Sequence, residues 1–128
     1  MNKPKGFTLV EILVVVAIIA LLATIAIPNL LRARITANES SAKATLKAIS
    51  SAIEIYASIN SLYPSNTTVI VGNPAYLSVD YFTGIYNGYT FTPTLTQSSY
   101  VVVALPSASS QGTESYTIST GSVLVTNP

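Results

Sequence analysis

The N-terminal part of the chain is a nearly unbroken apolar run. From Phe7 to Ile27 only two threonines and Glu11 are polar. Leu30 and Leu31 follow, so the run has about the 20 residues that a membrane-spanning helix needs. We therefore predict a helix over residues 7–31 that is apolar enough to cross a membrane.

Residues 32–59 change from uniform to one-sided hydrophobicity. Apolar side chains recur there at intervals of three, four and seven residues, at Ile35, Ala42, Leu46, Ile49, Ile53 and Tyr56. This apolar stripe predicts an amphipathic helix, with Lys43, Lys47 and Glu54 off the stripe. Both segments are expected to form one helix over residues 7–59, about 80 Å long at 1.5 Å per residue. A small domain cannot bury such a helix, so its first half must contact lipid or other subunits.

Pro28 lies inside this helical pattern. Its nitrogen carries no hydrogen, so it cannot donate to the carbonyl of Thr24. We expect the helix to kink or loosen at this turn.

Residues 60–128 combine turn signals with short β-prone runs. The segments "VDYFTGIY" and "YTFTPTL" flank an Asn-Gly pair, which predicts a hairpin with a type I′ turn. "SYVVVALP" predicts another strand, and "SYTIST" and "SVLVT" predict a second hairpin near Gly121, after an exposed loop "SASSQGTES". A sheet with one apolar face needs a cover, which the amphipathic helix can supply. The expected fold is α+β: a long N-terminal helix packed on a small antiparallel sheet of four or five strands, with residues 60–128 as a β-rich head.

Charge and composition exclude several classes of function. All six basic residues lie in the first 47 positions, and beyond residue 60 only Asp80 and Glu114 are charged. The head therefore offers no basic patch for nucleic acid. The chain has no cysteine and no histidine, and no phosphate loop, paired carboxylates or nucleophile–base set is present. We expect no catalytic site, no cofactor and no metal, and we expect that the protein is not an enzyme.

Residues 1–6, "MNKPKG", form a short basic leader. Lys3 and Lys5 favour a cytoplasmic location for this end of the chain. One interpretation is a cleaved secretory signal peptide, whose apolar region is usually ~7–15 residues long. The run here is longer, and no A-x-A cleavage site follows it, which favours an uncleaved anchor.

Taken together, the leader ending in Gly6, then Phe7, Glu11 at the fifth position from Phe7, the apolar run and Pro28 resemble the class III signal sequence of type IV pilins and of type II secretion pseudopilins. The resemblance covers residues 1–35 closely and the rest only in architecture. It implies a prepilin that a prepilin peptidase cuts between Gly6 and Phe7, with N-methylation of the new amine of Phe7. It further implies a single-pass precursor in the inner (cytoplasmic) membrane. An inner-membrane assembly platform would then join it to identical or homologous subunits in an extracellular pilus or a periplasmic pseudopilus.

The resemblance also implies that Glu11 pairs with the N-terminal amine of an adjacent subunit during assembly, and that the helix loosens near Pro28 when subunits pack. An unpaired carboxylate is penalised in a low dielectric, so Glu11 can set the axial register between subunits. A carboxylate near a helix N-terminus is favoured by the helix dipole as well. The alternative is that Glu11 only caps the helix.

Three features depart from the family. Ala20 stands where many pilins have glycine, the absence of cysteine forbids the common C-terminal disulfide, and two carboxylates in the head are few for the calcium site of major pseudopilins. The leading hypothesis is the structural subunit of a type IV pilus. The alternatives are a pseudopilin, a membrane-tethered binding module that never polymerises, and a secreted β domain released by a signal peptide.

Overall fold

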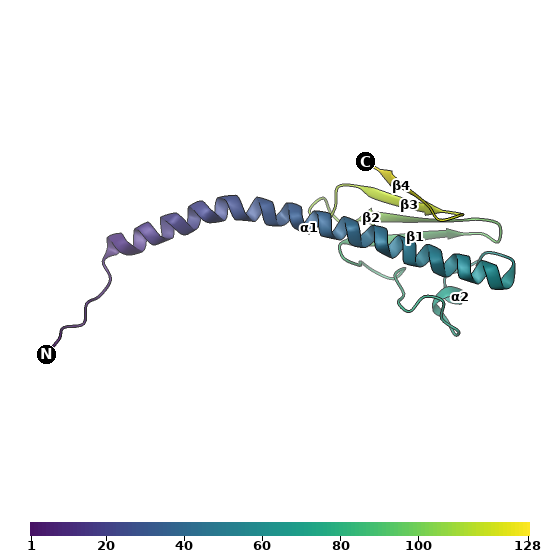
Figure 1. Cartoon of the computed structure of the whole chain (residues 1–128), viewed down its shortest axis with the longest axis horizontal. Helices are drawn as coiled ribbons and strands as arrows, with labels where there is room; N and C mark the ends of the chain where they lie inside the picture. The colour runs from purple at the N-terminus through teal and green to yellow at the C-terminus, as the bar shows by residue number, and fades with distance from the viewer. The chain divides into compact units, whose positions relative to one another are not determined.

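The computed structural model describes all residues, 1–128, and divides into two compact units, Met1–Ala33 and Arg34–Pro128. One long helix, α1, contributes to both units. The elements in chain order are α1 (Leu9–Asn60), α2 (Thr68–Val71), β1 (Tyr89–Leu95), β2 (Tyr100–Pro106), β3 (Ser115–Ser119) and β4 (Val123–Asn127) (Figure 1).

Helix α1 ends where the backbone turns left-handed. Ser61 has φ 62°, and its N–H donates to the carbonyl of Ala57 at 2.8 Å. The side-chain amide of Asn60 donates to the carbonyl of Tyr56 at 2.9 Å. The bond from Ser61 satisfies a carbonyl of the last helical turn, and the bond from Asn60 adds a side-chain donor at the same end of the helix.

The unit Met1–Ala33 consists of an extended leader and the first part of α1. The large apolar side chains of this part of the helix are all exposed. The helix is long and apolar enough to cross a membrane. It continues through Pro28, and the hydroxyl of Thr24 donates to the carbonyl of Ala20 at 2.9 Å. An apolar surface of this extent calls for lipid or protein to cover it.

The unit Arg34–Pro128 is a four-stranded antiparallel sheet, in the order β1-β2-β3-β4, packed against the second half of α1 (Figure 1). The helix contributes Ala42, Leu46, Ile49 and Ile53 to the core, all from the predicted apolar stripe. Alternate residues of the strands face them, including the fully buried rings of Tyr89, Tyr100 and Tyr116. The predicted α+β fold, with a long helix on a small antiparallel sheet, is confirmed.

The first predicted hairpin is only partly right. Asn87 and Gly88 form a tight turn with φ 47° and 79°, and Tyr86 and Tyr89 exchange two backbone hydrogen bonds of 2.7 and 2.9 Å across it. The segment "VDYFTGIY", however, is not a strand and makes only one isolated bridge.

Local structure in this segment competes with strand pairing. The carboxylate of Asp80 accepts a hydrogen bond from the N–H of Phe82 at 2.9 Å, a turn that bends the backbone. Gly84 then adopts φ +92°, and the rings of Tyr81 and Phe82 pack against the core. The second predicted hairpin is confirmed, with β3 and β4 joined through Gly121 at φ 80°.

Candidate processing and assembly site

The start of α1 is held by reciprocal hydrogen bonds between Thr8 and Glu11. The Thr8 N–H and hydroxyl both lie within hydrogen-bond distance of Glu11 Oε2, at 2.7 and 2.8 Å. The Glu11 N–H donates in return to the Thr8 hydroxyl at 3.2 Å. This is a capping box, which satisfies backbone donors that the first helical turn leaves without partners.

In this structure Glu11 caps the helix, which is the alternative role that the sequence analysis named for it. Pairing with an amine on another chain involves a second subunit, so it stays a prediction. The capping role of Thr8 was not predicted from the sequence, although the pattern Thr-x-x-Glu before an apolar run is a known signal of a capping box. Both bonds from Thr8 use Oε2, which leaves Oε1 without a hydrogen bond in this structure. Since a carboxylate can accept several hydrogen bonds, the cap and an additional partner can coexist.

The predicted cleavage site lies in extended chain just before the helix. Residues 1–8 have no regular secondary structure, and α1 begins at Leu9. Gly6 has no neighbouring atom within 4 Å of the position that a Cβ would occupy, and Phe7 is 86% exposed. A protease needs an extended and accessible backbone, and both conditions hold here. Cleavage after Gly6 and methylation of Phe7 remain predictions.

Pro28 and Glu11 do not meet in the structure but lie 17 positions apart on the same helix. Helix α1 continues without a break across Pro28. A loosened turn at this position in an assembled filament stays a prediction as well.

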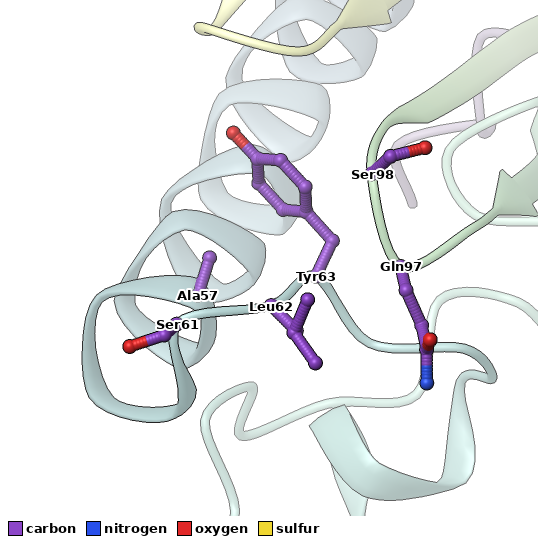
Figure 2. Close-up of a pocket in the computed structure, with 6 residues that line it drawn as sticks. All are labelled: Ala57, Ser61, Leu62, Tyr63, Gln97 and Ser98. Atoms are coloured by element: carbon purple, nitrogen blue, oxygen red, sulfur yellow. The ribbon is translucent and has the colours of Figure 1, made fainter.

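A hollow of about 670 Å³ lies in the head beside the C-terminal end of α1, lined by Ala57, Ser61, Leu62, Tyr63, Gln97 and Ser98 (Figure 2). None of these residues is an acid or a base apart from the phenol of Tyr63. Figure 2 shows the Tyr63 hydroxyl turned away from Gln97 and Ser98, and it donates to Glu54 at 3.2 Å. The pKa of Tyr63 is raised, mainly by burial and to a smaller extent by the negative charge of Glu54. A neutral phenol held in this way is a poor acid–base group at neutral pH.

Glu54 instead binds three parts of the head together. Its carboxylate accepts hydrogen bonds from Tyr100 Oη at 2.9 Å, from the N–H of Gly121 at 3.0 Å and from Tyr63. Ser50 lies 2.7 Å from Tyr100 Oη and 2.6 Å from the hydroxyl of Ser122. Burial raises the pKa of Tyr100, which keeps its hydroxyl protonated as a donor. This group, the Glu54 cluster, attaches α1 to β2 and to the β3–β4 turn.

The remaining carboxylates of the head are used locally. Glu114 accepts a hydrogen bond from the Tyr116 hydroxyl at 2.9 Å, and Asp80 accepts one from Phe82. No group of three or more Asp, Glu, His or Cys side chains comes together anywhere in the chain. The residues predicted for processing and assembly, Gly6, Phe7 and Glu11, all lie near the N-terminus.

Residues 1–27 match the family model of the prokaryotic N-terminal methylation motif. The start of the chain is therefore similar to the N-terminal segment that this family model describes. The motif contains the predicted cleavage site, Glu11 and most of the apolar run, in agreement with the resemblance found in the sequence.

Similar curated proteins come from both classes that the resemblance named. The chain is 45% identical over 71 residues to the type IV wide pilus major component PilA4 of Thermus thermophilus, covering 56% of this chain and 54% of that protein. It is 40% identical over 65 residues to the type II secretion system core protein G of Vibrio cholerae, covering 51% and 44%. It is 49% identical over 47 residues to the type IV major pilin protein PilA of Myxococcus xanthus, covering 37% and 21%. The chain thus matches about half the length, or less, of these relatives, which are components of pili and of a secretion system.

Proposed function

We propose that this protein is the structural subunit of a type IV pilus, made as a prepilin, cut by a prepilin peptidase and polymerised through α1. The observation that carries the proposal is the methylation motif at residues 1–27, which includes the start of α1, where the large apolar side chains are all exposed. The similarity to two pilus components supports the same function.

In this proposal residues 7–31 first anchor the precursor in the inner membrane. After cleavage, the same residues leave lipid and pack against identical or homologous subunits on the assembly platform, with the head facing outward. The protein is a substrate of the peptidase and catalyses no reaction itself.

Glu11 would recognise the amine of a neighbouring subunit. Its Oε2 stays with the capping box, and Oε1 accepts the charged N–H of a methylated Phe7 from the next subunit. A subunit that docks out of register leaves a carboxylate unpaired in an apolar surrounding, which costs several kcal/mol. The correct register is therefore selected energetically.

Glu11→Ala tests this role, with Thr8→Val as the matched control. Both substitutions break the capping box, but only the first removes the carboxylate. We expect Glu11→Ala to leave membrane insertion intact and to abolish or strongly reduce fibres in electron micrographs, while Thr8→Val still assembles. Normal fibres from Glu11→Ala would refute the pairing, and equal loss from both variants would assign Glu11 to capping alone.

The second candidate is a pseudopilin of type II secretion, favoured by the similarity to core protein G. Deletion of the gene separates the two functions. Loss of long surface fibres with normal secretion supports the pilus, whereas accumulation of secreted proteins in the periplasm supports the pseudopilus.

A further inference from the structure

The two outer strands of the sheet differ in how their free edges are protected. At β1, the N–H of Thr96 donates to the carbonyl of Ser99 at 2.9 Å. Hydrogen-bonded and non-bonded pairs alternate in an antiparallel ladder, so the backbone groups of Tyr89, Phe91, Pro93 and Leu95 face away from β2. Tyr89 is already bonded to Tyr86, and Pro93 has no N–H to offer. The β1 edge is therefore blocked in the way that natural sheets block their edges.

The β4 edge has no such protection. The N–H of Thr120 donates to the carbonyl of Tyr100 at 3.1 Å, so alternation turns Ser119 and Thr117 toward β4, where they pair with Val123 and Val125. Asn127 pairs with Ser115 in the same way, and the other two β4 residues, Leu124 and Thr126, direct their N–H and C=O groups to the open side. Strand β4 contains no proline, glycine or charged residue. An edge of this kind is a template for another strand.

We propose that β4 pairs with β4 of a second copy of this chain, antiparallel and about a two-fold axis at Val125. In this register Leu124 lies opposite Thr126 of the partner subunit, and Thr126 lies opposite Leu124 of the partner subunit. Each pair can exchange two backbone hydrogen bonds, so all the outward donors and acceptors of both residues are used. The two Val125 side chains then form a close non-hydrogen-bonded pair, with Cα atoms about 4.5 Å apart.

A second copy is the occupant that the structure favours. The strand is self-complementary in this register and brings no like charges together, because the four strands carry none. The alternative edge of the second copy, β1, is blocked by Pro93 and by the Tyr86–Tyr89 bonds. Pairing of two five-residue strands is small beside the ~1,200–2,000 Å² of a stable interface, so one contact is weak and many act together.

The two-fold axis reverses the direction of the partner. Strand β4 runs in roughly the opposite direction to the second half of α1 (Figure 1), so reversal of the strand also reverses the helix, and the two joined heads point in opposite directions. If the proposed function holds, the contact links filaments that run antiparallel, rather than neighbours within one filament. The strand pairing itself does not depend on that function.

Single cysteines test the register on a clean background, because the chain has no cysteine. The full chain with Val125→Cys, solubilised in detergent, is oxidised and run on a non-reducing gel. Val123→Cys is the matched control: Val123 is more exposed than Val125, 55% against 48%, yet in this register it lies about 13 Å from its counterpart. Thr117→Cys, on the same face of an inner strand, is a second control.

We expect a disulfide dimer with Val125→Cys and a yield at least about tenfold lower with either control, since a disulfide requires Cα atoms within ~7 Å. Equal yields from Val123→Cys and Val125→Cys would show random collision and overturn the proposal. The absence of a dimer with Val125→Cys would overturn it as well.

Charge exchange tests the same contact in assembled filaments. We expect Val125→Lys filaments and Val125→Glu filaments each to separate, and a mixture of the two to bundle again in electron micrographs. Bundling by Val125→Lys alone, or no bundling of the mixture, would contradict the two-fold pairing. If no filaments form, the proposed function fails, while the cysteine experiment in detergent still decides whether β4 pairs.

Discussion

The two halves of α1 are both rich in apolar side chains but expose them very differently. In the first half, Leu13 and Leu22 are 59% and 61% exposed. In the second half, Leu46, Ile49 and Ile53 are completely buried under the sheet. The second half is thus part of a self-contained fold, whereas the first half has no cover within its own unit. We infer that the exposed apolar side chains of the first half contact lipid and neighbouring subunits.

The same substitution in the two halves should have opposite consequences, and this gives the largest expected effect. Leu46→Ala creates a cavity beneath the sheet, and we expect it to lower the free energy of unfolding of the head by about 3 kcal/mol. Leu22→Ala, on the exposed half, should leave the stability of the head unchanged. Denaturant unfolding of the full chain in detergent measures both. A similar loss from both variants would mean that the halves do not differ as described.

The polar contacts of the second half provide a smaller test. Glu54→Ala leaves two phenols and the N–H of Gly121 without their acceptor, and we expect a loss of about 2 kcal/mol. Glu39, which accepts hydrogen bonds from Thr113 N–H and hydroxyl at 3.0 and 2.9 Å, is the matched control. Those bonds are exposed, so Glu39→Ala should cost less than about 1 kcal/mol. An equal effect of the two variants would show that the Glu54 cluster adds nothing beyond an ordinary surface contact.

The smallest effect is expected at the start of the first half. Thr8→Val removes the capping hydroxyl, which should destabilise the first helical turn locally by about 1 kcal/mol. Amide hydrogen exchange at Glu11 and Ile12, whose N–H groups donate to the hydroxyl and the carbonyl of Thr8, should become faster, with unfolding of the head unaffected. Unchanged exchange at these amides would show that the cap does not hold the helix start.

Much of this comparison follows from local sequence patterns. The apolar run and the apolar stripe are periodic, so the sequence predicts both the long helix and the face that packs on the sheet. The Asn87–Gly88 turn is also local and forms as predicted. The preceding arm does not become a strand, because the Asp80 turn, Gly84 and the packing of Tyr81 outweigh β propensity.

The Glu54 cluster could not be predicted, since its partners lie 9, 46 and 67 positions away in the chain. Glu54 is assigned by periodicity to the polar side of the helix, yet the fold brings three donors to it. The capping box at Thr8 and Glu11 is the opposite case. Its two residues lie three positions apart, and their pattern can be recognised in the sequence.

We propose that the mature protein begins at Phe7, directly after the leader, so that the exposed half of α1 follows its new N-terminus. Mass spectrometry of the N-terminal peptide from purified filaments tests this most directly. We expect a chain that starts at Phe7 and carries one methyl group on its amine. Intact Met1 in assembled fibres, or a mature N-terminus beyond residue 30, would contradict the claim.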